Sequence, residues 1–178
     1  MPPDLPAPRD ASVLVPVYRD AAGALHVVMM RRAAGGLHGG QLAFPGGRRE
    51  PHDADAWDTA LRETEEEIGL PRAAVTRLAT LPMVETRTTG MRIAPFLGRI
   101  ELPRAWRPDP AEVAELLDVP IAQLARPEAR GSSLETFPTW PVPQRIDWLL
   151  VGNHRLWGAS YRIFEPLMPR LLSGEWTI

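Results

Sequence analysis

Three glutamates in one short segment have the spacing of a metal-binding site. Glu63, Glu66 and Glu67 stand at positions i, i+3 and i+4, so in a helix their carboxylates lie on one side. They repel one another, and they crowd the last turn before Gly69, where the helix dipole disfavours acidic groups. A solvated acidic surface is the ordinary alternative. We favour a divalent cation site, because Mg²⁺ and Mn²⁺ prefer carboxylate oxygens and a cation converts the repulsion into binding.

The pattern around these acids predicts a helix over residues 54–68. Asp53 is suited to cap its amino end, and Gly69 stands where a glycine commonly ends a helix. Apolar and small residues recur at spacings of three and four, which predicts one buried face on the side opposite the glutamates. The residues of this face are Trp57, Ala60, Leu61, Thr64 and Ile68.

Apolar and β-branched runs elsewhere predict a fold dominated by strands. A hairpin is expected from two runs joined at Asp20–Gly23, since this turn lies between alternating apolar segments. The expected strands are residues 12–18, 25–31, 42–44, 75–84, 91–100, 116–119 and 144–151. A closing helix is expected over residues 157–172. Strands with two or three helices packed on them indicate the α+β class.

Composition narrows the function further. The chain has 178 residues, no cysteine and a net charge of −2, which excludes thiolate chemistry and gives no reason to expect a nucleic-acid partner. All 20 basic residues are arginines, so phosphate contacts must come from arginine or backbone N–H groups. We expect a flexible lead-in over residues 1–10 and a single domain over 11–178. No apolar run is long enough for a membrane span, and we expect a soluble, cytoplasmic protein.

The segment from Gly47 to Leu70 resembles the Nudix box. The core Arg-Glu-x-x-Glu-Glu-x-Gly-Leu is intact over residues 62–70. The segment departs from the box in three ways: Asp53 stands where glutamate is usual, the following spacer has eight residues rather than seven, and Thr64 takes an apolar position. The resemblance implies a Nudix-type α/β/α sandwich with a mixed β-sheet.

The same resemblance implies the roles of the box residues. The Gly47 carbonyl, Glu63, Glu66 and Glu67 would hold Mg²⁺ or Mn²⁺, and Arg62 would align the glutamates. The reaction implied is metal-dependent hydrolysis of a diphosphate in a nucleoside diphosphate derivative, in which positioning and charge neutralisation do most of the catalysis.

A second segment resembles the coenzyme A pyrophosphatase branch of this family. It comprises Gly40-Gln-Leu-Ala-Phe-Pro-Gly-Gly47 together with Thr59 to Glu63. The branch implies that coenzyme A or an acyl-CoA is cleaved to 3′,5′-ADP and (acyl-)4′-phosphopantetheine. ADP-ribose, NADH or another nucleotide remains the alternative substrate, and a non-catalytic nucleotide-binding module is the alternative from another class.

Further residues complete the expected site. Arg31 and Arg32 are the nearest cations for phosphate, and we assign His38 and Phe44, in the loop before the box, to substrate binding. Many Nudix enzymes form dimers, so a homodimer is an open expectation.

The general base is less determined than the metal ligands. Glu112, in the later segment Pro-Ala-Glu-Val, is the first choice because Nudix enzymes often take a base from a later loop. Glu115 or a glutamate of the helix is the alternative, since geometry decides such roles.

Overall fold

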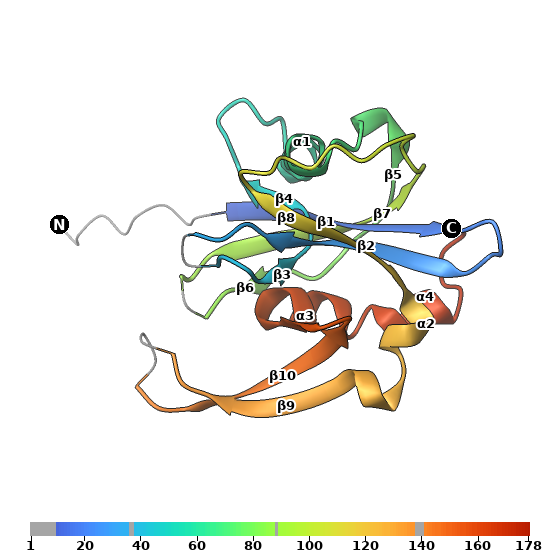
Figure 1. Cartoon of the computed structure of the whole chain (residues 1–178). Coiled ribbons are helices and arrows are strands. Elements are labelled where there is room, and N and C mark those ends of the chain that lie inside the picture. Colours follow the sequence, from blue (N-terminus) through green and yellow to red (C-terminus); the bar gives the residue numbers. More distant parts are fainter. Residues whose placement is uncertain (1–9, 36–37, 88, 138–140) are drawn as a thin grey trace.

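The computed structural model describes residues 10–35, 38–87, 89–137 and 141–178 (Figure 1). Their helices and strands, in chain order, are β1 (Asp10–Arg19), β2 (Leu25–Arg32), β3 (Leu42–Ala43), β4 (Gly46–Arg48), α1 (Ala56–Ile68), β5 (Val75–Thr80), β6 (Val84–Glu85), β7 (Arg92–Ile100), β8 (Val113–Pro120), α2 (Ile121–Leu124), β9 (Arg130–Glu135), β10 (Gln144–Val151), β11 (His154–Trp157), α3 (Gly158–Phe164) and α4 (Met168–Leu172). Two short 3₁₀ turns cover Arg72–Ala74 and Pro127–Ala129.

The main sheet is mixed. Its central path runs β3-β2-β1-β7-β5, with β8 paired to β2, β4 to β1 and β6 to β7. β1 and β7 run parallel, whereas β1 and β2 form the antiparallel hairpin predicted from the turn at residues 20–23. β9, β10 and β11 form a separate antiparallel sheet.

The helices and the two sheets are stacked in layers, because both faces of the main sheet are covered. α1 covers one face of the main sheet, and α3 lies on the other face, between the main sheet and the β9–β10–β11 sheet (Figure 1). Alternate residues of β2 serve the two sides: Val27 and Met29 pack in the core cluster on the α3 side, and Val28 and Met30 in the cluster that includes Ile68 of α1. Covered on both faces, β2 reads as a continuous apolar run. The α+β class and the α/β/α arrangement with a mixed sheet are confirmed.

Several element predictions differ from the structure. The expected closing helix over residues 157–172 is two short helices, α3 and α4, because Pro166 cannot continue α3 beyond its carboxyl end. β9 and β11 were not predicted. Of the expected lead-in, residues 1–9 lie outside the described residues, and Asp10 is already part of β1.

The surface is apolar in places. In the described part of the chain, no helix has the length and hydropathy needed to cross a membrane.

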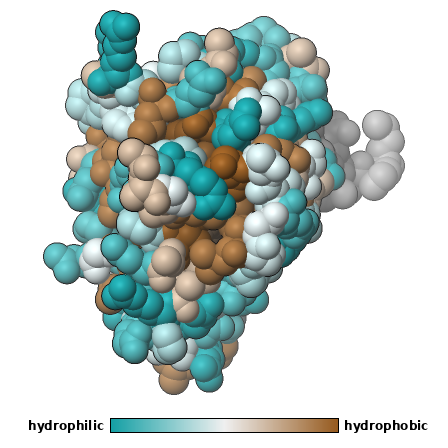
Figure 2. Space-filling model, turned by 90° about the vertical axis from the view of Figure 1, so that its right-hand side faces the viewer, coloured by the Kyte–Doolittle hydropathy of each residue, from teal (hydrophilic) through white to brown (hydrophobic). Residues whose placement is uncertain are grey.

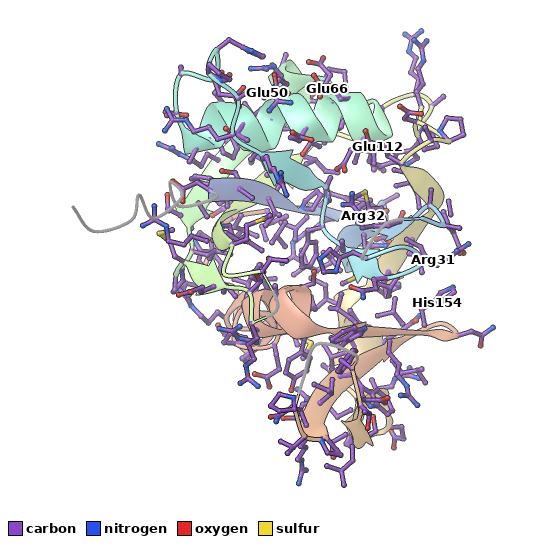
Figure 3. All side chains as sticks on the ribbon, turned by 90° about the vertical axis from the view of Figure 1, so that its left-hand side faces the viewer. Arg31, Arg32, Glu50, Glu66, Glu112 and His154 are labelled. Carbon is purple, nitrogen blue, oxygen red and sulfur yellow. The ribbon has the colours of Figure 1, made fainter. Side chains whose placement is uncertain are left out.

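Figure 2 views the side where the β1–β2 turn and α4 lie, and hydrophobic residues reach the surface there among hydrophilic ones. Figure 3 views the molecule from the opposite side and labels Glu50, Glu66 and Glu112.

Candidate active site

α1 carries the site, and its ends fix where the glutamates stand. Asp55 is the N-cap, with its side chain accepting from the Asp58 backbone N–H, and Gly69 ends the helix in the left-handed conformation at φ 70°. The expectation that Asp53 caps the helix and that the helix begins at residue 54 was therefore wrong. One residue, Ala54, separates Asp53 from the N-cap, so the Asp53 carboxylate is left for another partner.

That partner is Arg62. Its guanidinium binds Asp53 at two points, Nε to Oδ1 at 2.8 Å and Nη2 to Oδ2 at 3.0 Å. Nη1 donates to Glu63 Oε1 and to Glu66 Oε2, each at 3.0 Å. Nη2 also donates to the Arg48 carbonyl at 3.0 Å. Both Arg62 and Asp53 are buried, so the pair holds two site glutamates and the loop after β4 to the body of the helix.

The three glutamates lie in different environments. The side chain of Glu66 is 60% exposed and that of Glu63 is 15% exposed, whereas Glu67 is 2% exposed as a residue. The expectation that all three share a side opposite the buried face was wrong for Glu67. The Gly46 backbone covers it, and the Gly46 N–H donates to Glu67 Oε2 at 2.8 Å.

Gly47 is in tight contact with the first glutamate. A β-carbon added to Gly47 would lie 2.4 Å from both Cδ and Oε2 of Glu63. Real β-carbons are essentially never found that close to another heavy atom, so only glycine leaves the Glu63 carboxylate its place. Strand β4 thereby shapes the site from the side facing the helix.

Glu112 reaches the same carboxylates from a distant part of the chain. The Asp109 N–H donates to the carbonyl of Glu67 at 2.9 Å, and the Glu112 N–H donates to the Asp109 carbonyl at 3.0 Å. Burial is the main cause that raises the pKa values of Glu63 and Glu67, and the charge of Glu112 adds to both shifts. The structure thus brings the proposed base to the box glutamates.

Burial dominates the electrostatics of the site. Desolvation raises the pKa of Glu67 to about 8, although the Gly46 hydrogen bond and the nearby Arg32 oppose the shift. Desolvation also raises the pKa of Glu63, and Arg62 opposes it. Arg62 holds the pKa of Asp53 well below its usual range. Among these carboxyl groups, Glu67 is therefore the one whose desolvation is least offset by hydrogen bonds and nearby charges when no metal ion is bound.

The two strand-end arginines have separate partners. Arg32 Nη1 lies 3.8 Å from Glu67 Oε1, beside the box glutamates. Arg31 Nε instead donates to Glu115 Oε2 at 3.1 Å, and His154 Nε2 lies 3.4 Å from the same oxygen. In Figure 3, Glu112, Arg32, Arg31 and His154 follow one another from α1 toward the second sheet.

The remaining assigned residues, His38 and Phe44, have other partners. His38 is exposed and its Nδ1 lies 3.3 Å from Gln41 Oε1. Phe44 is 2% exposed and packs against Phe164 at a ring-centroid distance of 5.8 Å. Phe44 is thus a core residue that supports the loop, and we do not include it among the proposed substrate contacts.

The donor set fits a divalent cation, although it is not closed around one. Within the described residues, no three acidic or histidine side chains are grouped so that they could hold a metal ion. Arg62 Nη1 donates to both Glu63 and Glu66 and so bridges these two carboxylates. The carboxylates of Glu63, Glu66 and Glu67 are the kind of oxygen donors that Mg²⁺ or Mn²⁺ uses. Cation binding here requires these side chains to exchange partners.

Comparison with known proteins gives the family. The NUDIX domain model matches residues 8–139. The chain is 37% identical over 167 residues to a protein of Salmonella paratyphi B described as "Uncharacterized Nudix hydrolase NudL", covering 89% of this chain and 81% of that protein. The NudL protein of Escherichia coli is also 37% identical, over 153 residues, which cover 86% of this chain and 72% of that protein. The chain belongs to the Nudix family, whose hydrolases act on pyrophosphate bonds and generally use divalent metal ions.

Solved structures agree on the fold. A MutT/nudix family protein from Enterococcus faecalis has a TM-score of 0.64 at 19% identity, covering 96% of this chain and 64% of that one. The NUDIX domain of Shewanella oneidensis NrtR, solved with ADP ribose, has a TM-score of 0.53 at 18% identity, covering 69% and 79%. An Ap4A hydrolase from Caenorhabditis elegans has a TM-score of 0.53 at 19% identity, covering 63% and 80%.

Sequence reasoning missed two residues that the structure ties to the site. Asp53 was assigned to the helix cap, although its place in the box resemblance pointed to a role beside Arg62. His154 had no signal, because its partner Glu115 lies 39 positions away on another sheet.

Proposed function

We propose that this Nudix hydrolase cleaves the diphosphate of coenzyme A or an acyl-CoA, giving 3′,5′-ADP and (acyl-)4′-phosphopantetheine. The single observation that carries the proposal is the placement of Arg32 beside Glu67, at the end of the strand that leads into the loop resembling the coenzyme A branch. A cation next to the box glutamates supplies a phosphate contact that needs no lysine. The 37% identity to the NudL proteins, also described as Nudix hydrolases, supports the reaction class.

The residues divide the chemistry between them. Glu63, Glu66, Glu67 and the Gly47 carbonyl would hold Mg²⁺ or Mn²⁺. When bound, the metal supplies charge neutralisation and acidifies water. Arg32 binds a phosphate oxygen and restrains its orientation. Hydrolysis adds one water across the P–O–P linkage, and in this proposal Glu112 accepts the proton that the attacking water loses.

Arg62 and Asp53 hold the proposed metal-binding glutamates in position. Arg62 fixes Glu63 and Glu66 through one nitrogen, and Asp53 fixes Arg62 at two points. Positions held this rigidly preserve the alignment on which a positioning mechanism depends.

A substrate panel tests the proposal. Purified protein with Mg²⁺ or Mn²⁺ is offered coenzyme A, an acyl-CoA, ADP-ribose and NADH, and the products are identified. We expect the highest kcat/KM on coenzyme A or the acyl-CoA, with 3′,5′-ADP as a product, and loss of most of that activity in Glu66→Gln. Equal or faster cleavage of ADP-ribose or NADH would assign the alternative substrate. No turnover of any compound would favour the nucleotide-binding module.

The proposal also covers the domain organisation, partners, cellular location and oligomeric state of the enzyme. We take residues 11–178 as one domain, supported by a core cluster that contains residues of both sheets, among them Val15 and Leu149. A small-molecule substrate without a nucleic-acid partner is supported by the net charge of −2. A cytoplasmic location and a homodimer complete the proposal, and light scattering tests the dimer.

A further inference from the structure

A second group of charged side chains lies next to the site on its β11 side. It consists of Arg31 on β2, Glu115 on β8 and His154 on β11. Glu115 Oε2 accepts from Arg31 Nε at 3.1 Å and lies 3.4 Å from His154 Nε2. All three side chains are partly exposed, between 30% and 45%. One carboxylate oxygen thus gathers two cation-forming groups at the surface.

Glu115 holds Arg31 in a way that leaves its donors available. Only Nε of the guanidinium is used, and among the described residues neither Nη group has a hydrogen-bond partner. A guanidinium fixed at one edge presents a planar fork that matches a phosphate. Because Glu115 already orients the Arg31 side chain, the entropic cost of binding an anion there is smaller.

The strand geometry separates this group from the diphosphate site. β2 and β8 change register between Arg31 and Arg32, where Arg31 pairs with Glu115 and Arg32 with Val113. Arg32 reaches Glu67 on α1, whereas Arg31 reaches the side where His154 lies. Figure 3 shows the same order along one side of the molecule, from Glu112 through Arg32 and Arg31 to His154.

We propose that His154 and Arg31, held together by Glu115, form a second anion subsite that recognises a phosphate monoester carried by the substrate in addition to its diphosphate. A monoester is a dianion with three acceptor oxygens, so it satisfies the Arg31 fork and the histidine together. His154 is then a specificity-determining residue: it separates nucleoside diphosphate derivatives with an additional phosphate from those without one. This inference rests on the proposed function for its substrate pair.

Kinetics with a matched pair of substrates provide the first test. Coenzyme A and dephospho-coenzyme A differ only in the 3′-phosphate. His154→Gln should lower kcat/KM for coenzyme A about tenfold, mainly through KM, which is the effect of one lost charge-assisted contact. Its kcat/KM for dephospho-coenzyme A should stay within about twofold of the wild type. An equal loss on both substrates would overturn the subsite, because His154 would then serve the structure or the common reaction.

The neighbouring residue of β11 gives the control. Arg155 contacts Ser133 and Glu135 of β9 rather than Glu115. Arg155→Gln should therefore leave the ratio of the two kcat/KM values unchanged. A change in that ratio as large as the change in His154→Gln would also overturn the assignment.

Binding without turnover separates this inference from the proposed function. In calorimetry on the metal-free protein, 3′,5′-ADP should bind about tenfold more tightly than 5′-AMP, and His154→Gln should remove the difference. A wild-type protein that shows this preference but does not cleave coenzyme A would refute the proposed function and support the subsite. Equal binding of the two nucleotides by the wild type would refute the subsite, whatever the hydrolysis results.

Discussion

The carboxyl group of Glu63 occupies the space that a β-carbon on Gly47 would need, with Cδ and Oε2 only 2.4 Å from that position. Strand β4 and helix α1 are therefore fitted to each other at the point where the reaction is proposed to occur. The glycine serves here through its lack of a side chain.

Gly47→Ala should damage activity more than stability. The added methyl group displaces the Glu63 carboxylate, and a misplacement of about 1 Å can cost about a hundredfold in rate. The side chain of Glu63 can rotate away, so the fold should persist. Gly174→Ala is the control: its φ of 77° strains an alanine, but it lies far from α1 along the chain, so it should lower the melting temperature without a comparable loss of kcat. Full activity in Gly47→Ala would show that the Glu63 position seen here is not required.

Asp53→Asn should be strongly destabilising. It removes one partner of a buried ion pair, a change that typically costs about 3–5 kcal/mol because it leaves the other charge uncompensated. For a chain of this size the melting temperature should fall by about 10 °C. Asp55→Asn, two residues away, should change little, since asparagine caps helices as well as aspartate does. Similar melting temperatures for the two variants would mean that Arg62 does not depend on Asp53.

Burial of Glu67 should make the metal-free protein less stable as the pH rises. The pKa of this carboxyl is about 8 in the folded protein against a reference value of 4.5, so the folded state binds the extra proton between these values. The stabilisation is complete below pH 4.5 and is lost as the pH rises through 8. Each pKa unit is worth about 1.4 kcal/mol.

Glu67→Gln isolates this effect. In urea unfolding with a chelator present, the variant should gain roughly 2 kcal/mol or more relative to the wild type between pH 5 and pH 8. Glu65→Gln is the matched control, because that carboxylate is exposed on the same helix, and its difference from the wild type should be small at every pH. A Glu67→Gln variant whose difference from the wild type did not change with pH would contradict the burial of an ionisable group.

Metal binding should favour the ionised forms of these carboxylates and stabilise the folded protein. Mg²⁺ needs ionised carboxylates, so its affinity should weaken at low pH and its binding should release a proton from Glu67 at neutral pH. At a hundredfold excess over Kd the protein should gain about 2.7 kcal/mol. The rise in melting temperature should be clear at pH 8 and small at pH 5.

Variants of the proposed metal ligands should show a smaller metal-induced rise in melting temperature. Glu63→Gln and Glu67→Gln should reduce the shift, whereas Glu50→Gln should matter less, because Glu50 lies before the helix and near Arg62, 3.9 Å from Nη1. If neither Mg²⁺ nor Mn²⁺ at millimolar concentration shifted the melting temperature at pH 8, the metal site would have to be abandoned.

Local sequence spacing was enough to predict the helix and to propose a metal site on it. The i, i+3, i+4 spacing of Glu63, Glu66 and Glu67 and the terminating Gly69 depend only on the helical period and on the ease with which glycine adopts positive φ. The β1–β2 hairpin was predicted for the same reason, since its register depends on a short turn and on alternation within a few residues.

Only the tertiary structure decided how the three glutamates differ. Glu67 is buried because the backbone of Gly46, 21 positions earlier, folds over it. Glu112 enters the region from the turn before β8, and His154 enters it from β11; no local pattern places either of them beside β2. Helical spacing determines which side chains share a side of a helix, but burial and pKa depend on atoms contributed by the rest of the chain. The sequence therefore identified the residues that we propose as cation ligands, and the packing of β4, β8 and β11 decided the environment of each.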